Sequence, residues 1–139
     1  MSGRFFVDTN LLVYAHDLSG ESKHDKAREL VERLWRDRSG VLSTQVLQEL
    51  YVSLRKARNP LPAAEARQVL SDYLRWEVIV NTGESVLEAA DLEIRYRLSF
   101  WDALIIQAAV TSGAEILYSE DLSHGQAYGT VRVVDPFAS

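Results

Sequence analysis

The most constraining feature of this sequence is the alternation of short apolar segments with longer amphipathic ones. The short segments have the β-branched, apolar composition of strands and cover 4–7, 41–43, 76–81, 115–119 and 131–134. The longer segments repeat apolar residues at helical spacing and cover 11–17, 23–38, 44–57, 63–74, 86–96 and 101–112. Strands separated by helices indicate βαβ units. We therefore predict a three-layer α/β/α fold with a central five-stranded parallel sheet.

Length and composition are those of an ordinary globular domain. The 139 residues predict one domain covering 1–139, and the 47% hydrophobic and 25% charged fractions exclude a disordered tail or a collagen-like chain. The chain has no cysteine, which excludes disulfides, zinc–thiolate sites and cysteine nucleophiles. No apolar run reaches the ~18 residues of a membrane span, and Asp8 interrupts the first run too early for a signal peptide. We expect a cytoplasmic protein without membrane contact.

The charge balance limits how such a chain could handle nucleic acid. There are 15 lysines and arginines against 20 aspartates and glutamates, which gives a formal net charge of −5 at pH 7. A protein that binds nucleic acid through its overall charge is usually basic. If this chain acts on a phosphodiester, bound divalent cations are the expected source of local positive charge, because such ions can reverse the sign of a site.

Four acidic residues are expected at one edge of the predicted sheet. Ligands of parallel sheets bind beyond the carboxyl ends of the strands. Asp8 directly follows the first strand, and Asp121 follows the fourth. Asp102 lies in the first turn of the helix 101–112, and Glu49 borders the apolar stripe of the helix 44–57. We expect these four carboxylates to face the same cleft.

Each acid also has an ordinary structural explanation when it is considered alone. Asp8 and Asp121 could be turn or loop residues, and Glu49 could lie on a solvated helix flank. The segment from Ser99 to Asp102 fits a capping box in which the carboxylate closes back onto the start of its own helix. Asp102 is therefore open to both interpretations, and a capping role does not exclude a place in the cleft.

The combination of four acids favours a metal site. Two like charges 4 Å apart repel by roughly 4 kcal/mol at an effective dielectric constant near 20. A fold that gathers four carboxylates is therefore expected to hold a cation between them. Oxygen ligands without cysteine suit Mg²⁺ or Mn²⁺ rather than zinc. Metals held in this way activate water for in-line attack on phosphodiesters.

At these positions the sequence resembles the PIN-domain nucleases, and among them the VapC-type toxins of bacterial toxin–antitoxin pairs. The resemblance spans residues 4–137 and rests on four short motifs in the right order together with the closing VRVVDPF. The motifs are VDTNLLVY at 7–14, STQVLQEL at 43–50, LSFWDA at 98–103 and LYSEDL at 117–122.

The resemblance implies a function and a set of site residues. It implies an endoribonuclease that depends on Mg²⁺ or Mn²⁺, forms a homodimer and is inhibited by a cognate antitoxin that inserts residues into the cleft. The implied acidic quartet, which would be both catalytic and metal-binding, is Asp8, Glu49, Asp102 and Asp121. Asn10 and Ser119 would be polar helpers near the metal, although Asn10 could instead cap the first helix.

Several points stay open at the level of sequence. Glu120 is an additional acid whose participation the family pattern does not decide. The cluster Arg55, Lys56 and Arg58 could guide an RNA backbone or could be a solvated helix end. Two other functions also remain. One is an aspartate-dependent phosphatase, although Asn10 stands where a second aspartate is needed; the other is a non-catalytic RNA- or metal-binding module.

Overall fold

A six-stranded sheet forms the centre of the structure. The computed structural model describes residues 3–17 and 22–138. The strands, all short, are β1 (Phe5–Val7), β2 (Gly40–Ser43), β3 (Glu77–Ile79), β4 (Ile116–Tyr118), β5 (Ala127–Tyr128) and β6 (Val131–Val134). Their order across the sheet is β3-β2-β1-β4-β6-β5. The pairs β3–β2, β2–β1, β1–β4 and β4–β6 are parallel.

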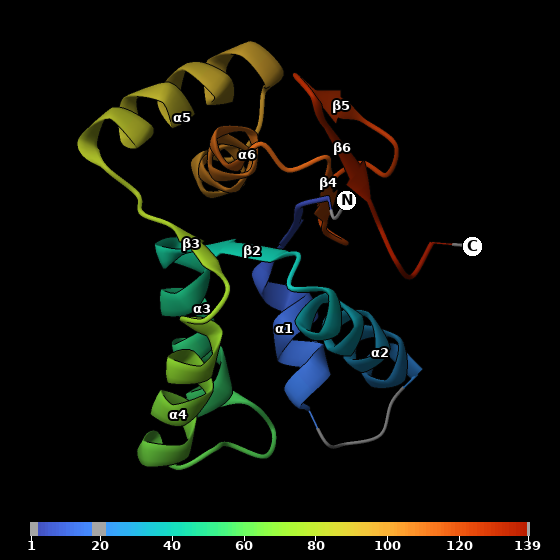
Figure 1. The fold of residues 1–139 in the computed structure, drawn as a ribbon. Coiled ribbons are helices and arrows are strands. Elements are labelled where there is room, and N and C mark those ends of the chain that lie inside the picture. The colour runs from blue at the N-terminus through green and yellow to red at the C-terminus, as the bar shows by residue number, and fades with distance from the viewer. Residues whose placement is uncertain (1–2, 18–21, 139) are drawn as a thin grey trace.

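Helices cover both faces of this sheet, so the predicted three-layer arrangement is confirmed. They are α1 (Thr9–His16), α2 (Ser22–Asp37), α3 (Thr44–Lys56), α4 (Ala63–Tyr73), α5 (Gly83–Tyr96) and α6 (Phe100–Ser112). Figure 1 shows α1 to α4 on one side of the strands and α5 with α6 on the other. Among the described residues, no helix is long and apolar enough to cross a membrane.

The strand count is the one correction to the predicted sheet. Five parallel strands were expected, whereas the structure adds β5, which pairs with β6 in the antiparallel direction. This strand has two residues, Ala127 and Tyr128, and only Tyr128 is buried. A segment of that length shows no alternation of apolar and polar residues, so the sequence carries no periodic signal for it.

The order of the strands places two chain segments side by side that are far apart in sequence. From β1 the chain moves outward through β2 to β3, and it then returns through α5 and α6 to β4 on the other side of β1. The boundary between β1 and β4 is therefore the point at which the direction of winding reverses. In open α/β sheets, ligands bind beyond the strand ends at this switch point.

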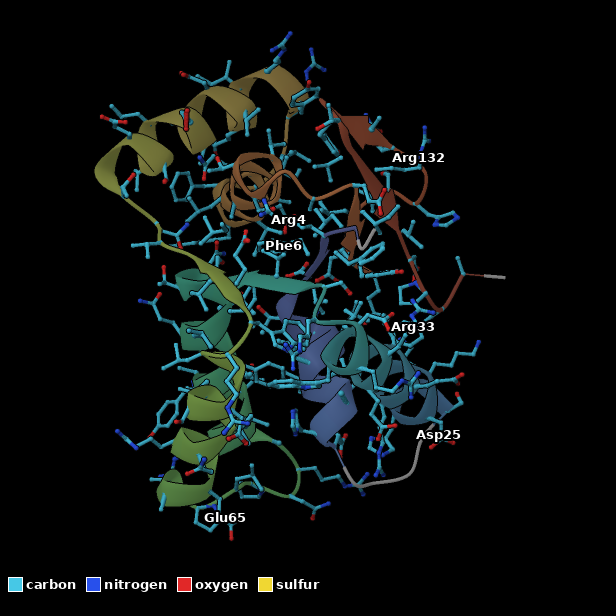
Figure 2. The ribbon with its side chains drawn as sticks, in the orientation of Figure 1. Arg4, Phe6, Asp25, Arg33, Glu65 and Arg132 are labelled. Carbon is cyan, nitrogen blue, oxygen red and sulfur yellow. The ribbon has the colours of Figure 1, made fainter. Side chains whose placement is uncertain are left out.

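The core lies between the sheet and its helices. Phe6 of β1 has no exposed surface and lies in the middle of the molecule, whereas Asp25, Glu65 and Arg132 project from its periphery (Figure 2). Helix α6 is the most buried helix, since every residue from 103 to 109 is buried. It ends at Gly113, whose φ of 73° is the left-handed conformation that glycine adopts without strain.

Candidate active site

The four acids predicted from the sequence line one pocket. This pocket has a volume of about 490 Å³ and lies at the carboxyl ends of β1 and β4, where the winding of the sheet reverses. Elements that are far apart in the sequence contribute its walls. The lining residues are Asp8, Thr9, Asn10, Gln45, Gln48, Glu49, Val52, Ser53, Trp101, Asp102, Ile105 and Asp121.

Asp8 forms the buried floor of the pocket. It follows β1 and caps α1, because its Oδ1 accepts a hydrogen bond from the backbone N–H of Thr9 at 2.7 Å. Its Oδ2 accepts a second bond from the hydroxyl of Ser119 at 2.9 Å. Burial raises the pKa of Asp8 to about 6, and the negative charges of Asp121 and Glu49 also raise it, while the bonds from Ser119 and Thr9 act in the opposite direction.

Asp121 reaches the same pocket from the loop after β4. Its Oδ2 accepts a hydrogen bond from the side-chain amide of Asn10 at 2.6 Å. Its backbone N–H donates to the hydroxyl oxygen of Ser119 at 3.2 Å. Burial raises the pKa of Asp121, followed by the negative charges of Glu120, Asp102 and Asp135. Ser119 therefore joins the two strand-end acids, since its hydroxyl bonds to both residues.

Glu49 enters the pocket from α3 and is held by two neutral donors. The hydroxyl of Thr9 donates to Oε1 of Glu49 at 2.6 Å, and the side-chain amide of Gln45 lies 3.2 Å from its Oε2. The same Gln45 nitrogen lies 3.2 Å from the backbone oxygen of Trp101. Contacts through Glu49 and Gln45 thus connect the starts of α1, α3 and α6 around the pocket.

Asp102 lies on the opposite wall, in the first turn of α6. Ser99 caps this helix, because its hydroxyl accepts a hydrogen bond from the backbone N–H of Asp102 at 3.1 Å. The reciprocal bond of a capping box is not formed, and the Asp102 carboxylate has no hydrogen bond or ion pair within the described part of the chain. The cap is therefore the work of Ser99, and the carboxylate remains available to the pocket.

The donor set of the pocket fits a hard divalent cation. Every acidic side chain of the pocket offers oxygen atoms, and Oε1 of the buried Gln45 has no hydrogen-bond partner among the residues that the structure describes. Such oxygens suit Mg²⁺ or Mn²⁺. Over residues 3–17 and 22–138, however, no three acidic or histidine side chains already form a compact metal-binding cluster. Asp8, Glu49 and Asp121 are instead hydrogen-bonded to neutral donors, so the acids converge on one pocket without forming a coordination sphere.

The polar helpers named from the sequence lie where they contact the acids. Ser119 bonds to Asp8 and to the backbone of Asp121, and Asn10 bonds to Asp121. The helix cap at this position is provided by Asp8, not by Asn10, because α1 begins at Thr9 rather than at Leu11. The capping interpretation of Asn10 is therefore wrong.

Sequence reasoning missed three residues that shape the pocket. Thr9 and Gln45 orient Glu49, and Trp101 is 63% exposed at the pocket wall. The local signal for two of them is adjacency, since Thr9 follows Asp8 and Trp101 precedes Asp102, whereas Gln45 lies four residues before Glu49. Which acid they contact depends on the packing of α1, α3 and α6, and a single sequence does not encode that packing in a readable pattern.

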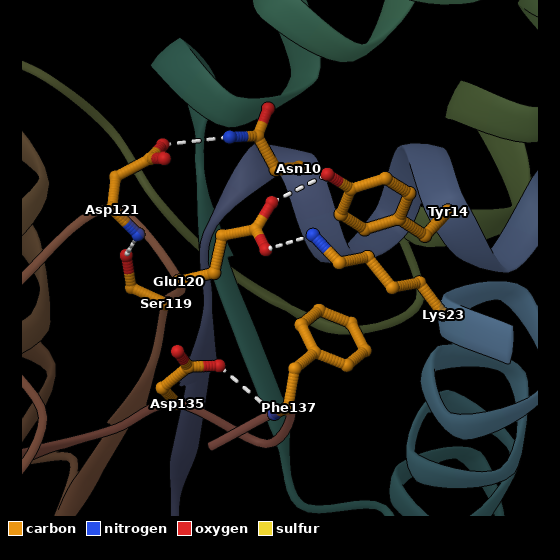
Figure 3. Close-up of polar contacts among 8 residues, drawn as sticks. All are labelled: Asn10, Tyr14, Lys23, Ser119, Glu120, Asp121, Asp135 and Phe137. Carbon is orange, nitrogen blue, oxygen red and sulfur yellow. Dashed lines mark hydrogen bonds and ion pairs between the residues drawn. The ribbon is translucent and has the colours of Figure 1, made fainter.

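Two charged features noted in the sequence lie outside the pocket. Arg55, Lys56 and Arg58 are exposed, and Arg55 donates to the backbone oxygen of Leu61 at 2.9 Å. Glu120 points away from the pocket toward Tyr14 and Lys23, while its neighbour Asp121 points toward Asn10 (Figure 3). An RNA-guiding role of the basic cluster stays a prediction.

Comparison with known families adds a match over most of the chain. The sequence model of the PIN domain family matches residues 5–129. Among curated proteins, no significant match was found.

Solved structures share the fold across nearly all of their length. The VapC20 toxin of Mycobacterium tuberculosis, which cleaves the sarcin–ricin loop, is 24% identical with a TM-score of 0.66, over 83% of this chain and 88% of that one. A toxin–antitoxin complex from Klebsiella pneumoniae gives 21% identity and a TM-score of 0.70, over 95% and 97%. The DNA-bound VapBC of Salmonella typhimurium is 18% identical with a TM-score of 0.68, and the match covers 98% of this chain and 99% of that one. At these identities the likeness establishes a common fold.

Proposed function

The chain belongs to the PIN domain family, and from that premise we propose that it is a metal-dependent endoribonuclease that acts as the VapC-type toxin of a toxin–antitoxin pair. The observation that carries the proposal is the convergence of four carboxylates on one pocket at the switch point of the sheet. Without a bound cation this convergence does not stabilise the fold, because burial and mutual repulsion raise the pKa values of Asp8 and Asp121. A bound cation would offset that cost.

In the proposed mechanism the chain's own residues hold and orient the reacting groups. The residues that would hold the ion are Asp8, Glu49, Asp102 and Asp121. When bound, Mg²⁺ or Mn²⁺ supplies an activated water and neutralises charge that develops at phosphorus. Ser119 and Thr9 orient the carboxylates of Asp8 and Glu49 through their hydroxyls. Asn10 does the same for Asp121, so the carboxylates of Asp8, Glu49 and Asp121 are positioned before substrate arrives.

The proposed partners follow from the solved relatives. Several of these relatives are complexes of a toxin with its antitoxin, from Klebsiella pneumoniae, Rickettsia felis and Salmonella typhimurium. We extend this arrangement to the present chain: a cognate antitoxin inhibits it by occupying the acidic pocket, and the toxin is a cytoplasmic homodimer. Sedimentation of the purified chain, alone and with the product of an adjacent gene, tests whether the homodimer and the complex with an antitoxin form.

The decisive experiment compares Asp8→Asn with the unaltered chain, both purified without antitoxin. Cleavage of single-stranded RNA in Mn²⁺ should be lost in Asp8→Asn, since the central acid of the pocket is neutralised while its shape is kept. Asp25→Asn, which changes an exposed acid on α2, is the matched control and should cleave normally. Undiminished cleavage by Asp8→Asn would exclude the proposed site. Hydrolysis of a small phosphomonoester without RNA cleavage would support the phosphatase, and metal binding without turnover would support a non-catalytic module.

A further inference from the structure

We propose that Glu120 is a positioning residue for the acidic pocket, held by Tyr14 and Lys23 so that the loop after β4 presents Ser119 and Asp121 in a fixed orientation. We call these three residues, Tyr14, Lys23 and Glu120, the loop clamp. The proposal rests on the proposed function, because it assigns Glu120 an effect on metal binding by Asp121. It also gives a role to the one acid of the SED segment that does not line the pocket.

Both carboxylate oxygens of Glu120 are occupied. The hydroxyl of Tyr14 donates to Oε1, and Nζ of Lys23 lies 2.7 Å from Oε2. The Glu120 side chain is 17% exposed and the Lys23 side chain is 43% exposed, so the carboxylate end of this ion pair is the shielded one. Figure 3 shows the Glu120 carboxylate facing both the tyrosine hydroxyl and the lysine amine.

Aromatic rings surround the lysine of the loop clamp. Nζ of Lys23 lies 5.2 Å from the ring centroid of Tyr14 and 5.3 Å from that of Phe137. The two rings meet edge to face with their centroids 5.6 Å apart. Phe137 is itself fixed, because its backbone N–H donates to Oδ1 of Asp135 at 2.9 Å. These contacts limit the positions open to the lysine and favour a defined ion pair.

One face of α1 therefore holds two consecutive residues of the loop. Asn10 and Tyr14 are four residues apart, which places them one turn apart on the same face of a helix. Asn10 contacts Asp121, and Tyr14 contacts Glu120. Adjacent side chains that are held in different directions fix the peptide plane between them. The loop clamp is thus joined to the pocket through one peptide bond and through the helix that Asp8 caps.

Ser119 carries this constraint to Asp8. It directly precedes Glu120, donates its hydroxyl to Asp8 and accepts the backbone N–H of Asp121. Its own backbone N–H donates to the oxygen of Val134 in β6 at 3.1 Å. Rotation of the loop about this point would move Ser119 and Asp121 together, and the loop clamp opposes that rotation.

The test uses two variants that break the clamp in different ways and one matched control. Glu120→Gln keeps the hydrogen bond to Tyr14 and removes the charge, whereas Lys23→Met keeps the apolar stem and removes the ammonium. Glu32→Gln is the control, because it breaks the exposed Arg28–Glu32 ion pair on α2, away from the pocket. Mn²⁺ binding is measured by titration calorimetry, and exchange of the Asp121 amide hydrogen is measured in metal-free protein.

Both clamp variants should bind Mn²⁺ about 10–100-fold more weakly, the range found when a residue that orients a metal ligand is changed. They should also exchange the Asp121 amide faster, while kcat at saturating Mn²⁺ recovers to that of the unaltered chain. Glu32→Gln should change none of these quantities. Recovery of kcat at saturating metal distinguishes positioning from a direct part in the chemistry.

Two results would overturn the proposal. One is Mn²⁺ affinity and amide exchange in Glu120→Gln equal to those in Glu32→Gln. The other is a kcat that stays low at saturating Mn²⁺ with unchanged affinity, which would mean that Glu120 acts on the substrate. Failure of the proposed function looks different, because Asp8→Asn would then cleave RNA as well as the unaltered chain does. The exchange measurement would still report on the clamp in that case.

Discussion

Asp8 is the buried acid of the pocket, with 7% of its surface exposed, whereas Glu49 and Asp102 are half-buried and Asp121 is exposed. Burial penalises its charged form, and nearby negative charges add to the penalty. The hydrogen bonds from Ser119 and from the backbone of Thr9 offset only part of it. Asp8 therefore carries a larger electrostatic cost in the metal-free site than Asp121, whose pKa is also raised.

Replacing Asp8 by asparagine should stabilise the metal-free protein at neutral pH. The rise in the pKa of Asp8 from 3.8 to about 6 corresponds to a cost of about 3 kcal/mol for the ionised side chain. Asparagine avoids this cost, and its Oδ1 can still accept from the Thr9 amide. Urea unfolding should give Asp8→Asn a higher free energy of unfolding than the unaltered chain. A lower value would show that the negative charge itself supports the fold.

The same residue predicts a pH dependence with a definite sign. The pKa of Asp8 in the folded state lies above its unfolded value, so protonation of Asp8 stabilises the folded state. This stabilisation is complete below about pH 4 and is lost as the pH rises through about 6. As the pH falls, the free energy of unfolding of the unaltered chain should therefore rise relative to that of Asp8→Asn. The rise should be about 1 kcal/mol between neutral pH and about pH 5. Parallel unfolding curves of both proteins at the two pH values measure the change. A constant difference would contradict the raised pKa.

At the scale of whole elements, helix α6 assigns capping and the supply of a carboxylate to the pocket to two different residues, Ser99 and Asp102. The segment from Ser99 to Asp102 predicts a capping box, but in the structure Ser99 alone forms the cap. Helix caps are local and follow from residue type and spacing. The direction of the Asp102 carboxylate is not local, because it depends on how α6 packs across the sheet from α1 and α3.

Two variants of α6 test this separation. Ser99→Ala should lower the free energy of unfolding by about 1 kcal/mol, the usual cost of a lost cap, and should leave the stabilisation by Mn²⁺ unchanged. Asp102→Asn should cost little in the metal-free protein and should reduce that stabilisation. Thermal melts with and without Mn²⁺ distinguish the two. If Asp102→Asn destabilised the metal-free helix and left the Mn²⁺ effect intact, the carboxylate would act in capping after all.

Trp101 at the start of α6 should contribute to RNA binding. It is 63% exposed and lines the pocket beside Asp102. Stacking of an unpaired base on an aromatic side chain contributes about 1–3 kcal/mol, so Trp101→Ala should raise KM for single-stranded RNA roughly tenfold, while Trp101→Phe restores most of the loss. Leu87→Ala is the matched control, because Leu87 is 69% exposed on α5 and lies outside the pocket. An equal KM in both alanine variants would exclude stacking.

The strand ends could be read from the sequence, whereas the contacts around them could not. Asp8 and Asp121 follow apolar runs that end abruptly, and parallel strands bring such ends to one edge; their shared pocket was therefore predictable. Asn10 was assigned either a cap or a place beside the metal-binding acids, and only the structure shows that Asp121, 111 residues away, is its partner. The two-residue strand β5 was missed because it exists only through its pairing with β6.

At the scale of the whole molecule, the net charge of −5 and the acidic pocket act in the same direction. Both disfavour an approaching RNA backbone, and the basic residues on α3 lie outside the pocket. Monovalent salt screens charges over a Debye length of about 10 Å at 0.1 M wherever they lie. A divalent cation held by the pocket neutralises the charge of the pocket alone and leaves the rest of the surface negative.

This difference predicts how Mn²⁺ and NaCl affect stability. At a Mn²⁺ concentration of about 100 times its Kd, binding to the folded state should add about 2.7 kcal/mol, which raises Tm by roughly 10 °C in a chain of this size. NaCl at equal ionic strength should raise Tm much less, because it only screens. Asp8→Asn should lose most of the Mn²⁺ effect and keep the NaCl effect, since only the first depends on the pocket. Differential scanning fluorimetry of both proteins measures all four shifts. Equal shifts with Mn²⁺ and NaCl would mean that the acids share a pocket without binding a metal.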